Sequence, residues 1–300
     1  MSAKPYISIV ICTFNRAASL RRTLASLLSL RKPSSTFELV VVDNNSSDDT
    51  AAVVQEHRQR ALYDVSCVFE HRQGQSNARN RGASEARGDI VAFTDDDTLI
   101  SEDWLLEIEK AFETYSDAVV VGGKILPEWE ARRPAWLVDD ILEMLAVVDH
   151  GDRPLRLETP LLFGANFVCR ARMLSGPQPF DPGLGRVGRN LRGGEETAFQ
   201  KNILLHGGSI YYIPSLVIRH VIDQARVERN YFRKYAFWNG RQRGKALRAA
   251  GLRLNGTGAS KASREVGRLV AVFRRRRGIV IELRAIHYLG MLYGFFYKTT

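Results

Sequence analysis

Three consecutive carboxylates, Asp95-Asp96-Asp97, follow an apolar run that ends at Phe93. Because like charges packed together repel, such a triplet needs a compensating positive charge. A hard divalent cation, Mg²⁺ or Mn²⁺, supplies that charge and can bridge the carboxylates to a bound diphosphate. A solvated loop capping the helix near Ser101 would use the same residues without any chemistry, so the triplet alone leaves both interpretations open.

Glu195 and Glu196 form a second acidic group, placed after Gly193-Gly194 at the start of an amphipathic helical pattern. One of these glutamates could be the general base that takes a proton from an acceptor hydroxyl. A transfer that uses one such base and no protein nucleophile inverts the anomeric centre. Stabilisation of the helix N-terminus is the non-catalytic alternative.

Other polar side chains also stand at the ends of apolar runs. Asp43 and Asn44 can accept hydrogen bonds from a ribose or a base, although Asp-Asn-Asn-Ser-Ser is equally strong turn chemistry. Arg79 lies early in a helical pattern, where its fixed charge could face phosphates or simply lie on a surface helix. His220 ends a short apolar run and is either a metal ligand or a structural histidine.

The elements that must position these residues alternate over about 120 residues. Strand-like apolar runs are followed by amphipathic helical patterns, and the runs cover residues 6–12, 38–42, 65–69, 90–93 and 118–121. This alternation predicts an α/β fold with a parallel sheet and helices on both faces. Ligands bind at the carboxyl ends of such strands, so Thr13 with Asn15, Asp43 with Asn44, and the triplet should share one rim.

After residue 125 the alternation becomes less regular. We expect a lid-like or acceptor-facing segment over 127–160, a strand over 161–170, and short strands over 209–213 and 216–220. The three cysteines lie far apart in apolar runs and should be buried, free thiols of a reducing compartment. The N-terminus has no signal-peptide pattern, and we find no run of about 18 apolar residues that could span a membrane.

The net charge of +10 is concentrated in the tail. From residue 224 onward there are 18 Lys and Arg against 3 Asp and Glu, in a segment expected to be helical with a break at 251–263. Apolar and aromatic residues over 288–297 accompany the basic cluster 274–277, a combination that suits docking at an anionic membrane through 264–298. Packing on the catalytic part is the alternative, and nothing in the first half gives a reason to expect nucleic acid.

Taken in order, these motifs resemble the inverting family 2 glycosyltransferases of GT-A fold over about residues 5–222. The matching segments are Thr13 to Arg16, Val42 to Asp48, Gly74 to Gly82, Gly88 to Ile90, Asp95 to Asp97, Gly164 to Asn166, Phe180 to Gly185, Gly194 to Glu196 and Pro214 to His220. The resemblance implies a Rossmann-like nucleotide-binding fold with a mostly parallel sheet.

The resemblance also implies roles for individual residues. Asp43 would contact the base, Asp95 the ribose or the metal, and Asp97 would be the principal metal ligand, with Asp96 between them. Thr13 and Arg79, with Asn15 and Asn44, would line the nucleotide site, and His220 would approach the diphosphate or the metal. The family's base is usually the Asp of a Glu-Asp pair, so Glu196 takes that place here, beside Glu195.

The sequence therefore predicts a metal-dependent, hexosyltransferase-like enzyme that moves a sugar from a nucleoside-diphosphate sugar, expected to be a UDP-sugar, to a saccharide or lipid-linked acceptor. Residues 1–222 would be the catalytic domain, with a nucleotide-binding half over about 5–125 and an acceptor-binding half over 126–222. Residues 223–300 would be a basic helical region. The expected location is cytoplasmic, peripheral on the cytoplasmic face of a membrane, in envelope polysaccharide or glycolipid synthesis.

Two other functions use similar residues. A sugar-nucleotide nucleotidyltransferase would be expected to carry a Gly-rich Arg/Lys loop after the first strand, where this chain has Thr13-Phe14-Asn15-Arg16. A non-catalytic nucleotide-sugar binding protein would tolerate glutamine at both 195 and 196.

Overall fold

The computed structural model describes residues 6–188, 190–191, 193–249 and 278–296. The chain forms two compact units. The first comprises Met1–Glu130, Ala146–Gly188 and Gly193–Ile222, and the second comprises Ala131–Leu145, Arg189–Arg192 and Asp223–Thr300. The functional division into 1–222 and 223–300 stays a prediction.

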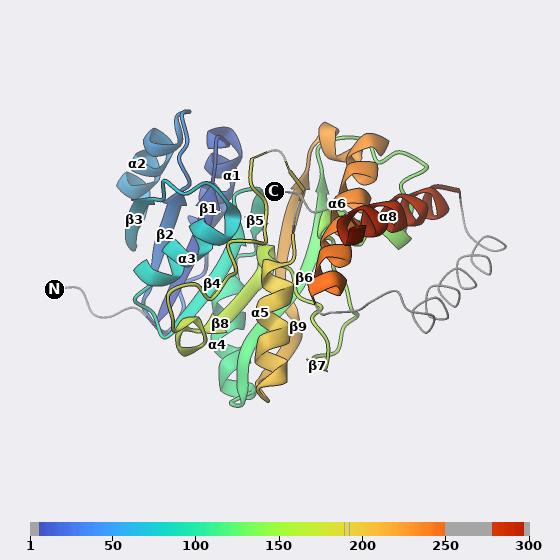
Figure 1. Ribbon diagram of the computed structural model, residues 1–300. Helices are drawn as coiled ribbons and strands as arrows, with labels where there is room; N and C mark the ends of the chain where they lie inside the picture. The colour runs from blue at the N-terminus through green and yellow to red at the C-terminus, as the bar shows by residue number, and fades with distance from the viewer. Residues whose placement is uncertain (1–5, 189, 192, 250–277, 297–300) are drawn as a thin grey trace. The chain divides into compact units, whose positions relative to one another are not determined.

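A nine-stranded mixed sheet organises the first unit, in the order β3-β2-β1-β4-β8-β6-β9-β5, with β7 paired to β9 (Figure 1). The strands are β1 (Ile7–Thr13), β2 (Phe37–Asp43), β3 (Asp64–Phe69), β4 (Ile90–Asp95), β5 (Thr98–Ile100), β6 (Ala118–Trp129), β7 (Leu155–Leu157), β8 (Phe167–Arg170) and β9 (Ser209–Ile222). Strands β1 to β4 are parallel, β8 runs antiparallel between β4 and β6, and β9 is parallel to β6. This mixed α/β fold with a mostly parallel sheet confirms the predicted class.

Helices connect successive strands. They are α1 (Ala17–Leu27), α2 (Thr50–Arg60), α3 (Gln75–Glu85), α4 (Trp104–Thr114) and α5 (Glu195–Leu205). Helix α3 packs directly on β1 and β2. Gly82 allows this close approach, because a methyl group there would lie only 2.3 Å from Val10 Cγ1. On α1 the periodic Leu20, Leu24 and Leu27 are fully buried, which stabilises the fold by roughly 1.5–3 kcal/mol per side chain.

The five predicted strands of the first half are present, but two strand expectations for later segments were wrong, and the lid-like or acceptor-facing role of 127–160 stays a prediction. Only Phe167–Arg170 of the expected strand 161–170 is extended, because Gly164–Asn166 forms a 3-10 turn (η2) whose Asn166 side chain donates to two strand carbonyls. The expected strands 209–213 and 216–220 are one strand, β9, since a register irregularity in its pairing with β6 absorbs the Pro214 region. Part of 127–160 belongs to β6 and β7, with a 3-10 segment (η1, Asp139–Leu145) between them.

The described part of the second unit is largely helical. Helices α6 (Arg229–Ala249) and α8 (Gly278–Phe296) pack backbone to backbone, because each presents two glycines four residues apart to the other. A methyl group at Gly240, Gly244, Gly290 or Gly294 would lie 1.9–2.2 Å from a carbonyl oxygen of the partner helix. The short 3-10 helix η4 (Gln224–Val227) precedes α6. The predicted break at 251–263 and the basic cluster 274–277 lie outside the described residues.

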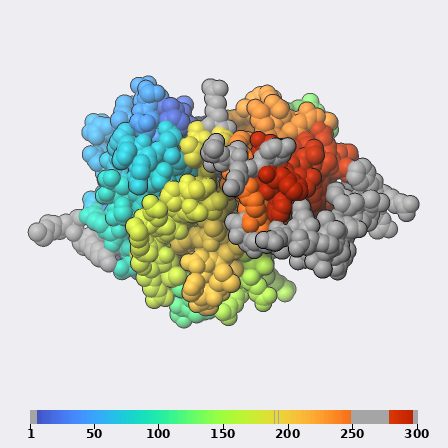
Figure 2. Space-filling view, viewed as in Figure 1, coloured from blue at the N-terminus to red at the C-terminus, as the bar shows by residue number. Residues whose placement is uncertain are grey.

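Helix α8 corrects the expectation that no segment could span a membrane. It is 19 residues long with a mean hydropathy of 1.3, enough to cross a bilayer by length and composition alone. Its sequence contains no unbroken apolar run of that length, because Glu282 and Arg284 interrupt the first half of the helix. Its outer side chains include Leu289 and Phe296, which are 63% and 61% exposed, and the helix is visible in red on the face shown in Figure 2.

The three cysteines are free, but they are not all buried as expected. Cys169 is buried, Cys12 is partly buried and Cys67 is exposed. Cys67 lies on β3, the edge strand of the sheet, where alternate side chains face solvent.

Candidate active site

The ends of β1 and β4 bring the first loop against the acidic triplet. Strand β1 lies between β2 and β4 in parallel register, with Thr13 level with Asp43 at the end of β2. The Thr13 hydroxyl donates a 2.7 Å hydrogen bond to Asp96 Oδ2. Asp96 and Asp97 are buried, whereas Asp95 is half-buried. The parallel strands therefore gather polar groups at one edge, as their order in the sequence predicted.

Arg16 supplies positive charge to this triplet, a contact that the sequence reasoning did not identify. Its Nη1 lies 3.3 Å from Asp96 Oδ1 and its Nη2 lies 3.1 Å from Asp97 Oδ2. Burial opposes the charge of Arg16, but the two carboxylates outweigh it and raise its pKa. Burial also raises the pKa of Asp96 to about 7, although the Arg16 charge acts against that shift. The available signal was an arginine at the start of the helix after the first strand.

Asp97 and His220 come together although 123 positions separate them. Strand β5 pairs antiparallel with β9 so that Thr98 faces His220, and the Val221 N–H donates to the Asp97 carbonyl. His220 Nε2 consequently lies 3.3 Å from Asp97 Oδ2, and both side chains are 3–4% exposed. The structure thus joins two of the three predicted metal ligands.

The third predicted ligand, Asp95, points elsewhere. Its Oδ1 lies 3.5 Å from Arg79 Nη2. In the described ranges no three His, Cys, Asp or Glu side chains form a ready metal cluster. One carboxylate oxygen and one imidazole nitrogen still suit a divalent ion that takes its other ligands from water or phosphate oxygens. The nitrogen donor favours Mn²⁺ over Mg²⁺.

Arg79 organises a second cluster beside the triplet. The guanidinium is only 3% exposed and lies 2.5 Å from Glu195 Oε1 and 3.8 Å from Glu196 Oε2, in addition to its contact with Asp95. Gly164 makes the space for it, because a methyl group there would lie 1.9 Å from Arg79 Nη2. The sequence marked Arg79 and the glutamates separately, and helices α3 and α5 with the η2 turn bring them together.

The two glutamates have different environments. Burial and the neighbouring Glu196 charge raise the pKa of Glu195 to about 8, and these effects outweigh the opposing charge of Arg79. Burial also disfavours the charge of Glu196, but Arg79, a hydrogen bond from Glu195 and the Gly164 N–H together lower its pKa. The side chain of Glu195 is 1% exposed and that of Glu196 is 17% exposed. Glu196 is therefore the more accessible and more readily ionised carboxylate of the pair.

The remaining predicted nucleotide-site residues hold loops at the same rim. Asn44 donates from Nδ2 to the carbonyls of Glu70 and Arg72 and accepts from the Gly74 N–H. Asn15 accepts from the Ser47 N–H, and Asp43 accepts from the Ser46 N–H. Asn15, Asp43 and Asn44 thus shape the rim. The side-chain amide of Asn44 makes its hydrogen bonds to the backbone of the neighbouring loop.

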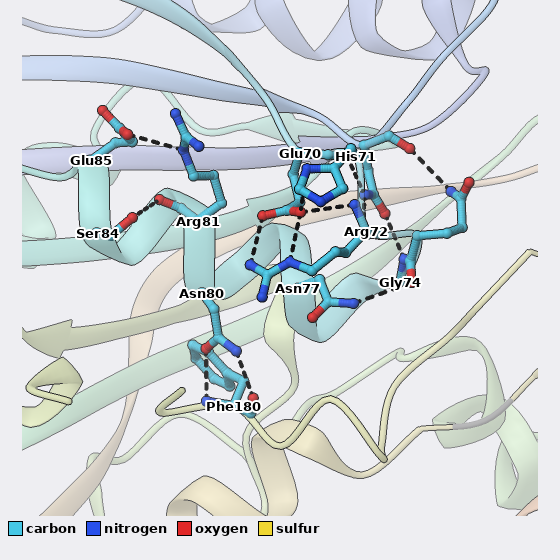
Figure 3. A network of polar contacts seen from close by, with 12 residues as sticks. Glu70, His71, Arg72, Gly74, Asn77, Asn80, Arg81, Ser84, Glu85 and Phe180 are labelled. Atoms are coloured by element: carbon cyan, nitrogen blue, oxygen red, sulfur yellow. Dashed lines mark hydrogen bonds and ion pairs between the residues drawn. The ribbon is translucent and has the colours of Figure 1, made fainter. Parts of the chain in front are cut away.

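Polar contacts of α3 position the loop that reaches Glu195. The Asn80 side chain donates to the Phe180 carbonyl and accepts from the Phe180 N–H, as Figure 3 shows. Ser76 donates to the Leu184 carbonyl four residues farther on. Gly185 then lies so close to Glu195 that an added methyl group would be 3.3 Å from Glu195 Oε2. One face of α3 thus holds the 180–185 loop against the second acidic cluster.

Comparison with known sequences supports the resemblance. The family model described as "Glycosyl transferase family 2" matches residues 8–174. The chain is 25% identical over 237 residues to the glucosyl-dolichyl phosphate glucuronosyltransferase of Haloferax volcanii, covering 78% of this chain and 75% of that protein. It is 28% identical over 252 residues to the succinoglycan biosynthesis protein ExoM of Rhizobium meliloti, covering 83% and 78%.

Solved structures share the fold. The mannosyltransferase PcManGT from Pyrobaculum calidifontis, in complex with GDP-Man and Mn²⁺, aligns with a TM-score of 0.64 and 17% identity over 98% of this chain and 88% of that one. GalNAc-T7 with UDP, GalNAc and Mn²⁺ aligns with a TM-score of 0.57 and 17% identity over 88% and 55%. The family model covers more than half of this chain, and the GT-A fold agrees with it. The chain is a glycosyltransferase and belongs to glycosyl transferase family 2.

Proposed function

We propose that this glycosyltransferase is metal-dependent and inverting, and that it transfers a sugar from a nucleoside-diphosphate sugar to an acceptor hydroxyl. The observation that carries the proposal is the pairing of Asp97 with His220 at the rim where β4 ends, beside Asp95 and Asp96. The two fold neighbours contain Mn²⁺ together with a nucleotide or nucleotide sugar, which supports the same chemistry here.

Asp97 and His220 would hold the divalent ion, with Mn²⁺ fitting this oxygen and nitrogen pair better than Mg²⁺. When bound, such an ion stabilises the negative charge that develops on the departing diphosphate. Asp95, which contacts Arg79, would bind the ribose. Asp96, fixed by the Thr13 hydroxyl, would orient the first loop toward the nucleotide.

The donor is proposed to be a nucleoside-diphosphate sugar, with a UDP-sugar as the first candidate. TarS from Staphylococcus aureus, a fold neighbour, was solved with UDP and with UDP-GlcNAc, whereas PcManGT holds GDP-Man. Asp43 would receive the base, because its carboxylate lies at the end of β2 and is turned by the Ser46 N–H at the rim. The choice between uracil and guanine is open to direct measurement.

Glu196 is proposed as the general base. Its greater exposure, its lowered pKa and the Gly164 N–H that fixes it suit a carboxylate that accepts a proton from the acceptor hydroxyl. Glu195 would keep Arg79 in place. We expect Glu196→Gln to abolish product formation while nucleotide binding persists. Full activity in both Glu195→Gln and Glu196→Gln would reject the general-base assignment.

The acceptor is proposed to be a saccharide or a lipid-linked glycan. The two relatives carry the names glucosyl-dolichyl phosphate glucuronosyltransferase and succinoglycan biosynthesis protein, which fit either class. The exposed apolar residues Leu289, Leu292 and Phe296 of α8, in a strongly basic segment, support peripheral docking at an anionic membrane on its cytoplasmic face.

A thermal unfolding assay with UDP, GDP, CDP and ADP, each with and without Mn²⁺, tests the donor and the metal together. A nucleotide at 100 times its Kd stabilises the fold by about 2.7 kcal/mol, so selective stabilisation names the donor class. Asp97→Ala should remove the Mn²⁺-dependent part of that shift, while the matched surface variant Glu56→Ala should keep it. A full Mn²⁺-dependent shift in Asp97→Ala would reject the metal assignment.

A further inference from the structure

The Asp97 oxygen that faces His220 is also the oxygen bound by Arg16. Asp97 Oδ2 lies 3.1 Å from Arg16 Nη2 and 3.3 Å from His220 Nε2. A cation that binds both His220 Nε2 and this Asp97 oxygen would share the oxygen with Arg16. The guanidinium and a divalent ion therefore compete for one carboxylate, and their like charges repel each other at that separation.

We propose that Arg16 is an internal counter-ion that keeps the metal site closed to free divalent ions and releases it when a nucleoside diphosphate binds. This inference rests on the proposed metal site at Asp97 and His220. It adds an order of events: Arg16 leaves Asp96 and Asp97 as the diphosphate offers it a new anionic partner, and the vacated carboxylate then takes the metal.

The local backbone aims Arg16 at the triplet and leaves its side chain able to turn. The residues on either side are tied to the loop after β2, since the Asn15 N–H donates to Ser46 Oγ and the Ala17 N–H donates to Asp48 Oδ2. Arg16 itself is 35% exposed, whereas the Asp96 and Asp97 side chains are 7% and 3% exposed. The carboxylates are fixed and buried, so the guanidinium is the partner that can move toward an incoming anion.

Charge balance gives the exchange its direction. Without nucleotide, Arg16 is the compensating cation for two buried carboxylates, and displacing it would leave a guanidinium without an anion. With a nucleoside diphosphate present, the phosphates become that anion, because a guanidinium binds phosphate oxygens as well as it binds carboxylates. Metal binding and nucleotide binding should consequently strengthen each other, and by linkage the effect is reciprocal.

The test is Mn²⁺ binding, measured by the electron paramagnetic resonance signal of free Mn²⁺, with the full-length protein. Wild type, Arg16→Gln, Arg16→Lys and Arg21→Gln are titrated with Mn²⁺ alone and with Mn²⁺ plus UDP or GDP. Arg21 is the matched control, because it lies on the same helix but pairs with the exposed Glu56. We expect Arg16→Gln to bind Mn²⁺ alone about fivefold more tightly than wild type, on the scale of a partly exposed ion pair.

Three comparisons complete the expected result. Arg16→Lys keeps the charge and should fall between wild type and Arg16→Gln, Arg21→Gln should match wild type, and the added nucleotide should tighten Mn²⁺ binding less in Arg16→Gln than in wild type. The roughly fivefold gain in affinity for Mn²⁺ alone that is expected of Arg16→Gln should vanish in the double variant Arg16→Gln/Asp97→Asn. If it persists there, the extra Mn²⁺ binds elsewhere and the proposal is wrong.

The same titrations separate a wrong counter-ion role of Arg16 from a wrong metal site. If wild type binds Mn²⁺ with nucleotide but Arg16→Gln binds Mn²⁺ alone no more tightly than wild type does, the counter-ion role is wrong and the metal site stands. Absence of Mn²⁺ binding in every variant, with and without nucleotide, overturns the metal site and the counter-ion role together.

Discussion

Replacing Gly164 by alanine is a minimal change that should displace Arg79 from its carboxylate partners. The added methyl carbon would lie 1.9 Å from Arg79 Nη2 and 2.5 Å from its Cζ, whereas ordinary contacts begin near 3.4 Å. The guanidinium must therefore move by about 1.5 Å. A shift of that size directed away from Glu195 would open the 2.5 Å contact to about 4 Å, beyond hydrogen-bonding distance.

Both stability and catalysis should respond. Leaving a buried charge without its partner costs about 3–5 kcal/mol, and because Arg79 is displaced but keeps its other carboxylates nearby, we expect Gly164→Ala to lower the free energy of unfolding by about 2–4 kcal/mol. A 1 Å misplacement near reacting groups can cost about a hundredfold in rate, so kcat/KM should fall by about that factor. The acidic limb of the pH–rate profile should also move to higher pH, because the Arg79 charge that lowers the pKa of Glu196 retreats.

Urea unfolding and steady-state transfer assays over a pH range measure these effects. Gly278→Ala is the matched control, since a methyl group there meets no atom within 4 Å. In an Arg79→Met background the clash disappears, and Gly164→Ala should add little further destabilisation. An unfolding free energy within about 0.5 kcal/mol of wild type, with unchanged kcat/KM, would refute the claim that this glycine exists to seat Arg79.

Three further outcomes follow from the structure. Glu195 has a pKa of about 8 in the folded protein against 4.5 when unfolded, so the folded protein holds a proton that the unfolded chain releases. The free energy of unfolding should therefore fall as pH rises from about 4.5 to about 8, by up to about 1.4 kcal/mol per pH unit. Glu195→Gln should remove this slope in chemical denaturation. Asn44→Ala deletes three hydrogen bonds, two of them buried, and should cost about 2–4 kcal/mol in urea unfolding, whereas Asn77→Ala, with one weaker bond, should cost less than about 1 kcal/mol. Leu289→Glu should reduce co-sedimentation with vesicles that contain phosphatidylglycerol several-fold relative to wild type, and unchanged pelleting would count against docking through α8.

Local patterns identified the first half of the fold because each signal is complete within a short segment. The apolar run of β1 predicts a strand and the leucine spacing of α1 predicts a helix, without reference to the rest of the chain. Parallel strands then place their carboxyl ends at one edge of the sheet. The later segments were less predictable. The three-residue β5 is a strand only because β9 lies beside it, and the η2 turn is held by Asn166 contacts to residues far away in the sequence.

The sequence by itself indicated the class of chemistry, through an acidic triplet at a strand end, an acidic pair at a helix start, and a basic tail. It could not decide which charges meet, because ion pairs depend on distances between residues that lie far apart in the chain. Only the tertiary structure paired Asp97 with His220 and Arg16, and directed Asp95 and Glu195 to Arg79. The physical reason is that Coulomb energy and burial depend on where side chains lie in space, and strand pairing across the sheet sets those positions.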